Sequence, residues 1–364
     1  MKTSLIKGLN EKDMQAVLNS LNFNGFYFPT LFPARFTPYL TWKSLAADQG
    51  IPVAADVVSY DSSSPRKRRS TVEKLQGDIP QIAIAREKSE SELNEYIQLL
   101  NFAQTGTNPA AQKALLDFIY GDVEFCFSGV GARLEYIALV ALSSGKLSLT
   151  KTNNQGMVTE TAIDFGVPTA NKTAVGTTWV TANAASATPI ADIKAKVKTA
   201  RQAGIRIKYL FMSQDTFDNM ATITEVQKFC ASWISQATGT QIAPNLASVN
   251  AAFAANNLPE IKIIESYVNV EIDGTRTVTD PWSTGIVTFS PDLVVGNTWN
   301  GPLADDMIDS SVAVKARRDY ILVKKWSEEE PIKEVTKGIA NAFPALSNPS
   351  HLYMLNVAGT SWAL

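Results

Sequence analysis

Few residues in this 364-residue chain could carry out catalytic chemistry. His351 is the one histidine, and it follows Asn348-Pro349-Ser350, a turn sequence. A histidine-dependent triad or a multi-histidine metal site therefore has at most one candidate, and a solvated loop is the better interpretation of His351. Cys126 and Cys230 lie in helical patterns without a close cysteine or histidine partner, so we expect free, buried thiols.

Two carboxylate clusters could bind a divalent cation. Asp305, Asp306 and Asp309 form the first cluster, and the second is Glu328-Glu329-Glu330. An ordinary solvated loop is the better interpretation of the aspartates. The glutamates precede Pro331 and predict the start of a helix, where acidic side chains complement the helix dipole. We expect no metal at either cluster.

Two glycine motifs also fail the tests for catalytic or phosphate-binding loops. Gly129-Val130-Gly131 sits inside a helical pattern and has no third glycine. Gly359-Thr360-Ser361 leaves no room for the helix that follows a catalytic serine. We therefore predict no catalytic residue and no cofactor, although an α/β enzyme with a carboxylate-based site in a mixed domain at 176–300 stays open as an alternative.

The four consecutive cations Arg66, Lys67, Arg68 and Arg69 are the most distinctive feature of the chain. They lie between two extended runs in the segment 57–88, and alternation over Gln81–Arg86 is typical of a strand. Serines, a proline and four cations cannot bury enough apolar surface to offset the entropy of chain ordering. This segment must stay in solvent or lie on a partner.

Three interpretations of the basic tip remain: contact with nucleic acid, contact with an acidic surface of another subunit, or a solvated loop. No aromatic residue occurs from Asp61 to Gly77, so any nucleic-acid contact would be to phosphates and without sequence preference. We favour the subunit contact, because a long arm without a core gains order only by lying on a neighbour.

Composition predicts a globular protein of one or two domains. The chain is 45% hydrophobic, and 33 basic against 35 acidic residues give a formal net charge of −2. The basic tip is thus a local feature on a nearly neutral molecule. The first eight residues lack the apolar run of a signal peptide, and no stretch approaches the roughly 20 apolar residues of a membrane helix.

Periodicity outlines the elements that surround these residues. The longest helix is predicted from Asn108 to Ser144, and Gly121, Gly129 and Gly131 within it suggest close packing across a sheet or a bend. Other helices are expected at 8–22, 87–104, 188–204, 213–220 and 224–236, and strands at 205–212, 261–270, 275–279, 285–290, 320–325 and 352–357, with a hairpin over 146–167.

In this order, the parts resemble the major capsid proteins of tailed bacteriophages, specifically the lambda-like capsid protein E family. Three stretches carry the resemblance. The first runs from Phe36-Thr37-Pro38-Tyr39-Leu40-Thr41-Trp42 to the strand ending at Glu87. The second joins Thr284–Phe289 to Leu293–Trp299. The third is 331–355, including Asn341-Ala342-Phe343-Pro344-Ala345-Leu346.

The resemblance implies an α+β fold with an N-terminal arm (1–50), an extended loop (51–86), a peripheral domain with a long spine helix (87–175), an apical domain (176–301) and a C-terminal return to the peripheral domain (302–364). The implied function is a structural subunit of an icosahedral capsid that forms hexamers and pentamers around packaged double-stranded DNA. Arg66–Arg69 would then be an intersubunit contact.

Implied partners are copies of the same chain, with scaffold, portal and decoration proteins and a non-specific contact with packaged DNA, and no membrane. The subunit would assemble in the host cytoplasm and reside in the virion capsid. An encapsulin-like nanocompartment shell and a phage tail structural protein stay open as alternatives. Some relatives of this fold cross-link subunits through a lysine and an asparagine, but no such pair is identified in this sequence.

Overall fold

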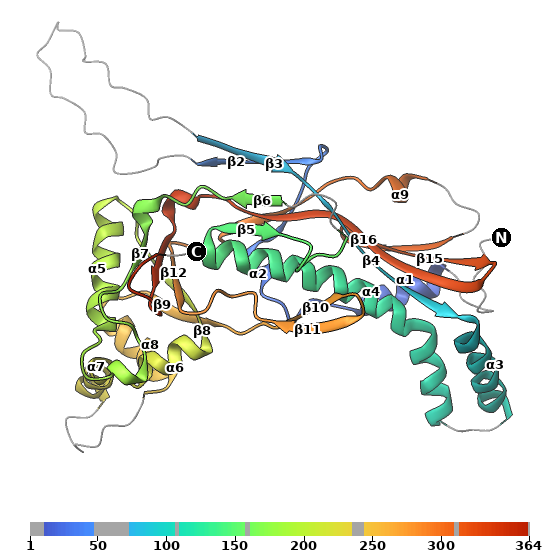
Figure 1. The fold of residues 1–364 in the computed structure, drawn as a ribbon, viewed down its shortest axis with the longest axis horizontal. Coiled ribbons are helices and arrows are strands. Elements are labelled where there is room, and N and C mark those ends of the chain that lie inside the picture. Colours follow the sequence, from blue (N-terminus) through green and yellow to red (C-terminus); the bar gives the residue numbers. More distant parts are fainter. Residues whose placement is uncertain are drawn as a thin grey trace, which may run out of the picture.

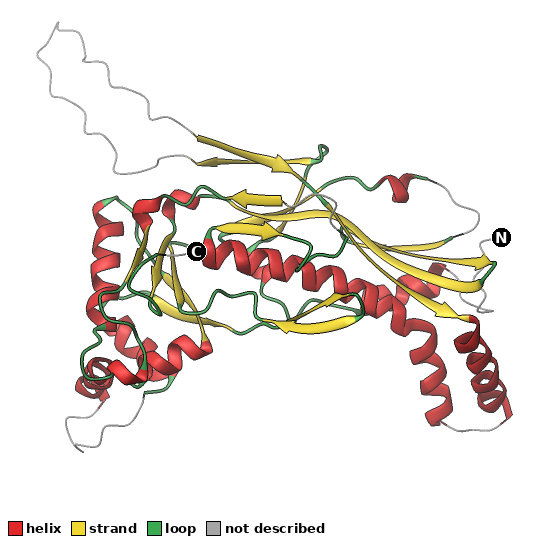
Figure 2. Ribbon diagram, in the orientation of Figure 1, coloured by secondary structure: helices red, strands yellow, loops and turns green. Residues whose placement is uncertain are grey.

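The computed structural model describes residues 11–46, 73–105, 109–156, 161–234, 244–308 and 313–362. It is an elongated α+β molecule whose two large sheets each have a hydrophobic core of their own (Figures 1 and 2). The six-stranded sheet and the long helix α4 form what we call the body. The five-stranded sheet and helices α5 to α8 form the end unit at one extremity of the body.

Strand β16 organises the body because it is 15 residues long and pairs along both edges. One edge pairs with β15, and the other edge pairs with β4 and then with β13. All neighbours are antiparallel except β1 and β13. The strands are β1 (Ala34–Phe36), β4 (Gln81–Ser89), β13 (Gly296–Asn300), β14 (Val314–Arg318), β15 (Ile321–Glu329) and β16 (Ile332–Leu346).

Helix α4 (Pro109–Ser144) has the predicted bounds and packs across β16, β4 and β15, so the expected helix-on-sheet arrangement is confirmed. Gly129 permits the close approach to the sheet, because a Cβ there would lie 2.7 Å from Ile84 of β4. Gly131 makes room for the N-terminal segment instead, because a Cβ there would lie 2.5 Å from Phe23. Gly121 is different, because a Cβ there would meet nothing within 4 Å. It lies where α4 passes from the small cluster it shares with α3 (Glu90–Thr105) to the main core.

By length and composition alone, the Lys113–Ser144 part of α4 could cross a membrane. This corrects the expectation that no such stretch exists. In the structure, however, 61% of its most apolar stretch is buried inside the protein. A buried core helix passes the same test of length and apolarity, and α4 is the central helix of the body.

The end unit has strand order β7-β17-β12-β8-β9. Its helices α6 and α7 lie close to the expected ranges, and α5 begins one residue after Thr188. Asp273-Gly274 forms the predicted hairpin turn between β10 and β11. The elements are β7 (Lys172–Ala174), β8 (Tyr209–Ser213), β9 (Glu260–Ile264), β12 (Ile286–Ser290), β17 (Tyr353–Asn356), α5 (Pro189–Gln202), α6 (Gln214–Ala221), α7 (Thr224–Ile234) and α8 (Leu246–Ala255).

Hairpins and short helices complete the described part of the chain. The hairpin predicted over 146–167 is confirmed as β5 and β6. These elements are α1 (Glu11–Ser20), α2 (Phe28–Leu31), β2 (Thr41–Ala46), β3 (Glu73–Asp78), β5 (Lys146–Leu149), β6 (Thr161–Asp164), β10 (Val268–Ile272), β11 (Thr275–Thr279), α9 (Ala304–Met307) and three 3₁₀ turns at Thr169–Asn171, Thr181–Asn183 and Pro349–His351.

Two predictions of secondary structure are wrong. The glutamates Glu328–Glu330 do not start a helix: β15 runs to Glu329, and a tight turn at Pro331 leads into β16. Glu328 forms an ion pair of 3.1 Å with Lys333 opposite it in the hairpin, so cross-strand pairing explains its charge. The strand predicted over 261–270 is in fact two strands, β9 and β10, separated by Glu265–Tyr267.

Two strands, β13 and β17, each pair in a different unit from the strand that precedes them in the chain. β13 lies within the range predicted for the apical domain, yet it pairs with β16 in the body. β17 lies near the end of the chain, yet it pairs with β12 and β7 in the end unit. The chain therefore crosses between the two units several times, which links their cores covalently as well as by packing.

Candidate functional site

The ribbon of β2 and β3 is the element that carries the segment with the basic tip. Its two strands pair antiparallel from Thr41–Asp78 to Ala46–Glu73 and run away from the body (Figure 1). Trp42 anchors the base of the ribbon: it is 2% exposed, and its ring centroid lies 5.9 Å from that of Phe343. Arg66, Lys67, Arg68 and Arg69 themselves lie outside the described residues.

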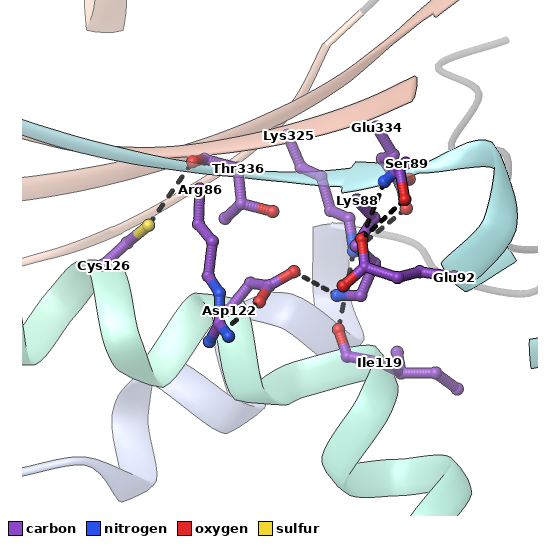
Figure 3. A network of polar contacts seen from close by, with 10 residues as sticks. All are labelled: Arg86, Lys88, Ser89, Glu92, Ile119, Asp122, Cys126, Lys325, Glu334 and Thr336. Atoms are coloured by element: carbon purple, nitrogen blue, oxygen red, sulfur yellow. Dashed lines mark hydrogen bonds and ion pairs between the residues drawn. The ribbon is translucent and has the colours of Figure 1, made fainter. Parts of the chain in front are cut away.

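A network of buried charges lies between α4 and the sheet (Figure 3). The Lys325 ammonium lies 3.3 Å from the Glu334 carboxylate, and both side chains are fully buried. Lys88, opposite Glu334 in the pairing of β4 with β16, forms an ion pair with Asp122 of α4. Arg86 reaches the same carboxylate at 3.6 Å. Three strands and the helix therefore meet through charged side chains at one place.

The electrostatics of this network favour a structural role. Burial lowers the pKa of Lys325, and the nearby Glu334 charge opposes that effect. Lys325 also donates to the backbone carbonyl of Ile119 on α4 at 3.5 Å. Removing either partner of a buried pair leaves an uncompensated charge, while the intact pair adds little net stability because both charges are desolvated. We therefore infer that the main effect of the network is to fix one register of α4 against the sheet. Sequence patterns did not single out these residues.

A second buried carboxylate holds the N-terminal segment on α4. Glu135 is fully buried, and its two carboxylate oxygens accept hydrogen bonds from the backbone N–H groups of Tyr27 (3.0 Å) and Phe28 (2.8 Å) at the start of α2. Burial raises the pKa of Glu135, and these hydrogen bonds oppose the rise. A negative charge at a helix N-terminus is favourable, so Glu135 fixes where the chain enters the core.

In the part of the chain that the structure describes, the cysteines and the histidine do not come together with one another. Cys126 and Cys230 are both free and buried, as predicted. Burial raises the pKa of Cys126 to about 11, which leaves it a protonated thiol near neutral pH. His351 ends a 3₁₀ turn and is half-buried rather than fully solvated.

Members of both candidate carboxylate clusters form ion pairs with basic side chains. Both carboxylate oxygens of Asp305 lie 2.9 Å from the Lys324 ammonium, and Asp306 pairs with Arg317. Asp309 lies outside the described residues. Within the described ranges, no group of three or more histidine, cysteine or carboxylate side chains could hold a metal ion.

One hollow lies between α4 and the β10–β11 hairpin, with a volume of about 240 Å³. Its walls are mainly threonine, aliphatic and amide side chains, together with the phenol of Tyr136. No carboxylate, histidine or cysteine lines it, so its threonine hydroxyls have no neighbouring base of these kinds to activate them.

Comparisons with known proteins agree with this geometry. A family model described as phage major capsid protein E matches residues 12–357. No curated protein sequence matches the chain. A solved structure from Escherichia coli CFT073, described as a prophage capsid protein, is similar with a TM-score of 0.59 and 14% identity over 96% of this chain and 99% of that one. A phage-related protein from Bordetella bronchiseptica RB50 is similar with a TM-score of 0.53 and 10% identity, over 96% and 97% of the two chains.

The architecture is therefore that of the major capsid proteins of tailed phages, as the order of parts in the sequence suggested. The chain belongs to the phage major capsid protein E family. It is a structural protein of a phage capsid and not an enzyme.

Proposed function

We propose that this chain assembles into hexamers and pentamers that close an icosahedral shell around packaged double-stranded DNA. The β2–β3 ribbon is the observation that supports this most. Its base is fixed in the core through Trp42, while its strands run away from the body. A compact monomer gains nothing from such a ribbon, whereas a shell subunit can lay it on a neighbour and bury more surface.

In this proposal, segment 51–86 is the extended loop and Arg66–Arg69 are its intersubunit contact. Residues 1–50 act as the N-terminal arm, 87–175 as the peripheral domain, 176–301 as the apical domain and 302–364 as the return to the peripheral domain. The four adjacent cations would repel one another without acidic partners, so a neighbour's carboxylates are their expected contacts.

Packaged DNA is proposed as a non-specific partner on the inner surface. The formal net charge of −2 fits the shell itself, since many nearly neutral copies can pack together without strong repulsion, and it leaves the inner face able to tolerate packaged DNA. Scaffold, portal and decoration proteins are proposed as further partners. Assembly in the host cytoplasm would precede residence in the virion.

Charge reversal at the tip tests the intersubunit role. We expect the variant Arg66→Glu, Lys67→Glu, Arg68→Glu and Arg69→Glu to remain folded but to lose most of its particles in sedimentation velocity. The matched control, Arg66→Lys, Arg68→Lys and Arg69→Lys, keeps every charge and should assemble like the wild type. Normal particles from the glutamate variant would refute the proposed contact.

A further inference from the structure

One helix of the end unit presents a row of cations to solvent. Lys194, Lys198 and Arg201 are exposed on α5 and lie at positions i, i+4 and i+7, which place them on one face of the helix. Among the described residues, no carboxylate forms an ion pair with any of them. The single acidic residue of α5, Asp192, accepts a hydrogen bond from the Trp179 indole instead, at 3.0 Å. We call the three cations the α5 stripe.

A different side of the same unit carries unpaired carboxylates around an exposed aromatic ring. Tyr267, in the short connection between β9 and β10, is 60% exposed. Three exposed carboxylates lie near it: Glu265 is two residues before Tyr267, Asp280 follows the Thr279 that pairs with Val268, and Asp215 is in the first turn of α6, which contacts β9. Loss of hydration, together with the negative charges of these carboxylates, raises the pKa of Tyr267. In the described part of the chain, none of the three carboxylates forms an ion pair with a cation. We call these four residues the Tyr267 patch.

The two surfaces lie on the rim of the molecule. Figure 1 looks down the shortest axis, and there α5 runs along the left edge while α6 and the β9–β10 connection lie along the lower edge. In the proposed shell we take this shortest axis as the shell normal, so that neighbouring copies meet at the rim. The α5 stripe and the Tyr267 patch can therefore face different neighbours at the same time.

Charge decides which surfaces can meet. In a two-fold contact, each surface would face its own copy. Two α5 stripes would then bring positive charges together, and two Tyr267 patches would bring negative charges together, which is unfavourable in both cases. The α5 stripe facing a Tyr267 patch brings opposite charges together, around a tyrosine of the type enriched at interface centres. Because each copy has both surfaces, this contact repeats head to tail, and it forms a ring where the rotation from copy to copy closes.

We propose that the α5 stripe of one copy docks on the Tyr267 patch of the next copy within a capsomer ring. This inference rests on the proposed assembly function and names one of its surfaces. Exposed charge pairs add little net affinity, so the contact mainly sets which edges pair and in which order.

A charge swap between the two surfaces tests the contact. The first variant carries Lys194→Glu, Lys198→Glu and Arg201→Glu, the second carries Asp215→Lys and Glu265→Lys, and the third carries all five substitutions. Asp280 is left unchanged because it also accepts a hydrogen bond from the Trp282 backbone. A control, Lys12→Glu with Lys151→Glu, reverses exposed lysines outside both surfaces.

Rings and shells are counted by electron microscopy, and circular dichroism melting shows whether each variant is folded. We expect the first two variants to need at least about tenfold more protein to assemble, because like charges then face each other. The third variant and the control should assemble near the wild-type concentration. Failure of the third variant while it remains folded, or normal assembly of the first two, would overturn the contact.

Two other outcomes separate this contact from different explanations. If the first variant assembles normally but loses binding to a short DNA duplex, the α5 stripe contacts nucleic acid and the proposed docking is wrong. If the wild-type chain forms no ring or shell under any condition, the proposed assembly function fails and the docking fails with it. If the wild-type chain forms shells and the charge-reversed variants assemble at the same protein concentration, only the proposed docking is refuted.

Discussion

Lys325 and Glu334 place two opposite charges in a fully buried position between β15, β16 and α4. Such a pair is costly to desolvate, so its partners depend on each other. The pair therefore restricts how the helix and strands can pack. Lys88 and Asp122 form a second buried ion pair beside it, between β4 and α4. At the scale of single residues, the molecule uses buried charge to specify one packing arrangement.

Breaking the buried pair tests this directly. We expect Glu334→Ala to lower the free energy of unfolding by about 3–5 kcal/mol, because the Lys325 charge loses its partner. The double variant Lys325→Met with Glu334→Leu should recover most of that loss, since no unpaired charge remains. Urea denaturation of unassembled subunits measures both. Equal losses in the two variants would argue against mutual dependence.

Lys196 offers a pH-dependent test. Its side chain is buried, the ammonium reaches the Asn171 carbonyl at 3.4 Å, and burial lowers its pKa from 10.5 to about 8. Below about pH 8 the lysine is charged in both folded and unfolded chains, so burial of the charge destabilises the fold fully. Between pH 8 and 10.5 the folded chain releases the proton first, and this destabilisation disappears.

The variant Lys196→Met removes the group and isolates its effect. We expect it to be more stable than the wild type at pH 7, with an advantage that shrinks as the pH rises from 8 to 10. Comparing the two proteins at each pH cancels contributions from other titrating groups. A stability difference that does not change over this range would contradict the account.

At the scale of elements, the packing of α4 on β16 depends on glycine. A Cβ at Gly338 of β16 would lie 2.6 Å from the Cys126 backbone oxygen of α4, so Gly338→Ala must push the helix away from the strand. We expect it to cost about 1–3 kcal/mol of stability. Gly121→Ala, where a Cβ meets nothing within 4 Å, is the matched control and should gain up to about 1 kcal/mol from helix propensity.

Thermal or urea unfolding of both glycine variants measures these effects. The account requires opposite signs for the two substitutions, because one site is crowded by backbone and the other is open. If Gly338→Ala were as stable as the wild type, the close approach of β16 and α4 would not be important for stability.

The elements that sequence predicts best are those with strong local signals. The bounds of α4 follow from its apolar length and from Pro109 at its first turn, and the β10–β11 hairpin follows from Asp273-Gly274. By contrast, Glu328–Glu330 have the composition of a helix start but lie at the end of β15. There, pairing with β16 overrides the local preference.

The buried network illustrates what local patterns miss. Lys88, Asp122, Lys325 and Glu334 look like ordinary surface charges in sequence, and only tertiary packing brings them together. Lys325 follows a run of buried apolar residues in β15, which is the one local sign of its burial. The four adjacent cations of the basic tip are a local signal and stand out in the sequence, whereas the partner we propose for them depends on assembly.

At the scale of the whole molecule, an elongated subunit with a projecting ribbon is suited to a shell (Figure 1). The chain passes from the end unit to β13 in the body and from the body to β17 in the end unit, so the two units are tied together by the chain itself. Family membership places the chain in a phage capsid, and the geometry supplies surfaces through which copies can join.

Electron microscopy of the purified wild-type chain tests the central claim most directly. The account predicts uniform closed shells, or rings with five-fold and six-fold symmetry, under conditions that favour association. A chain that stays a folded monomer at every protein and salt concentration tested would contradict it.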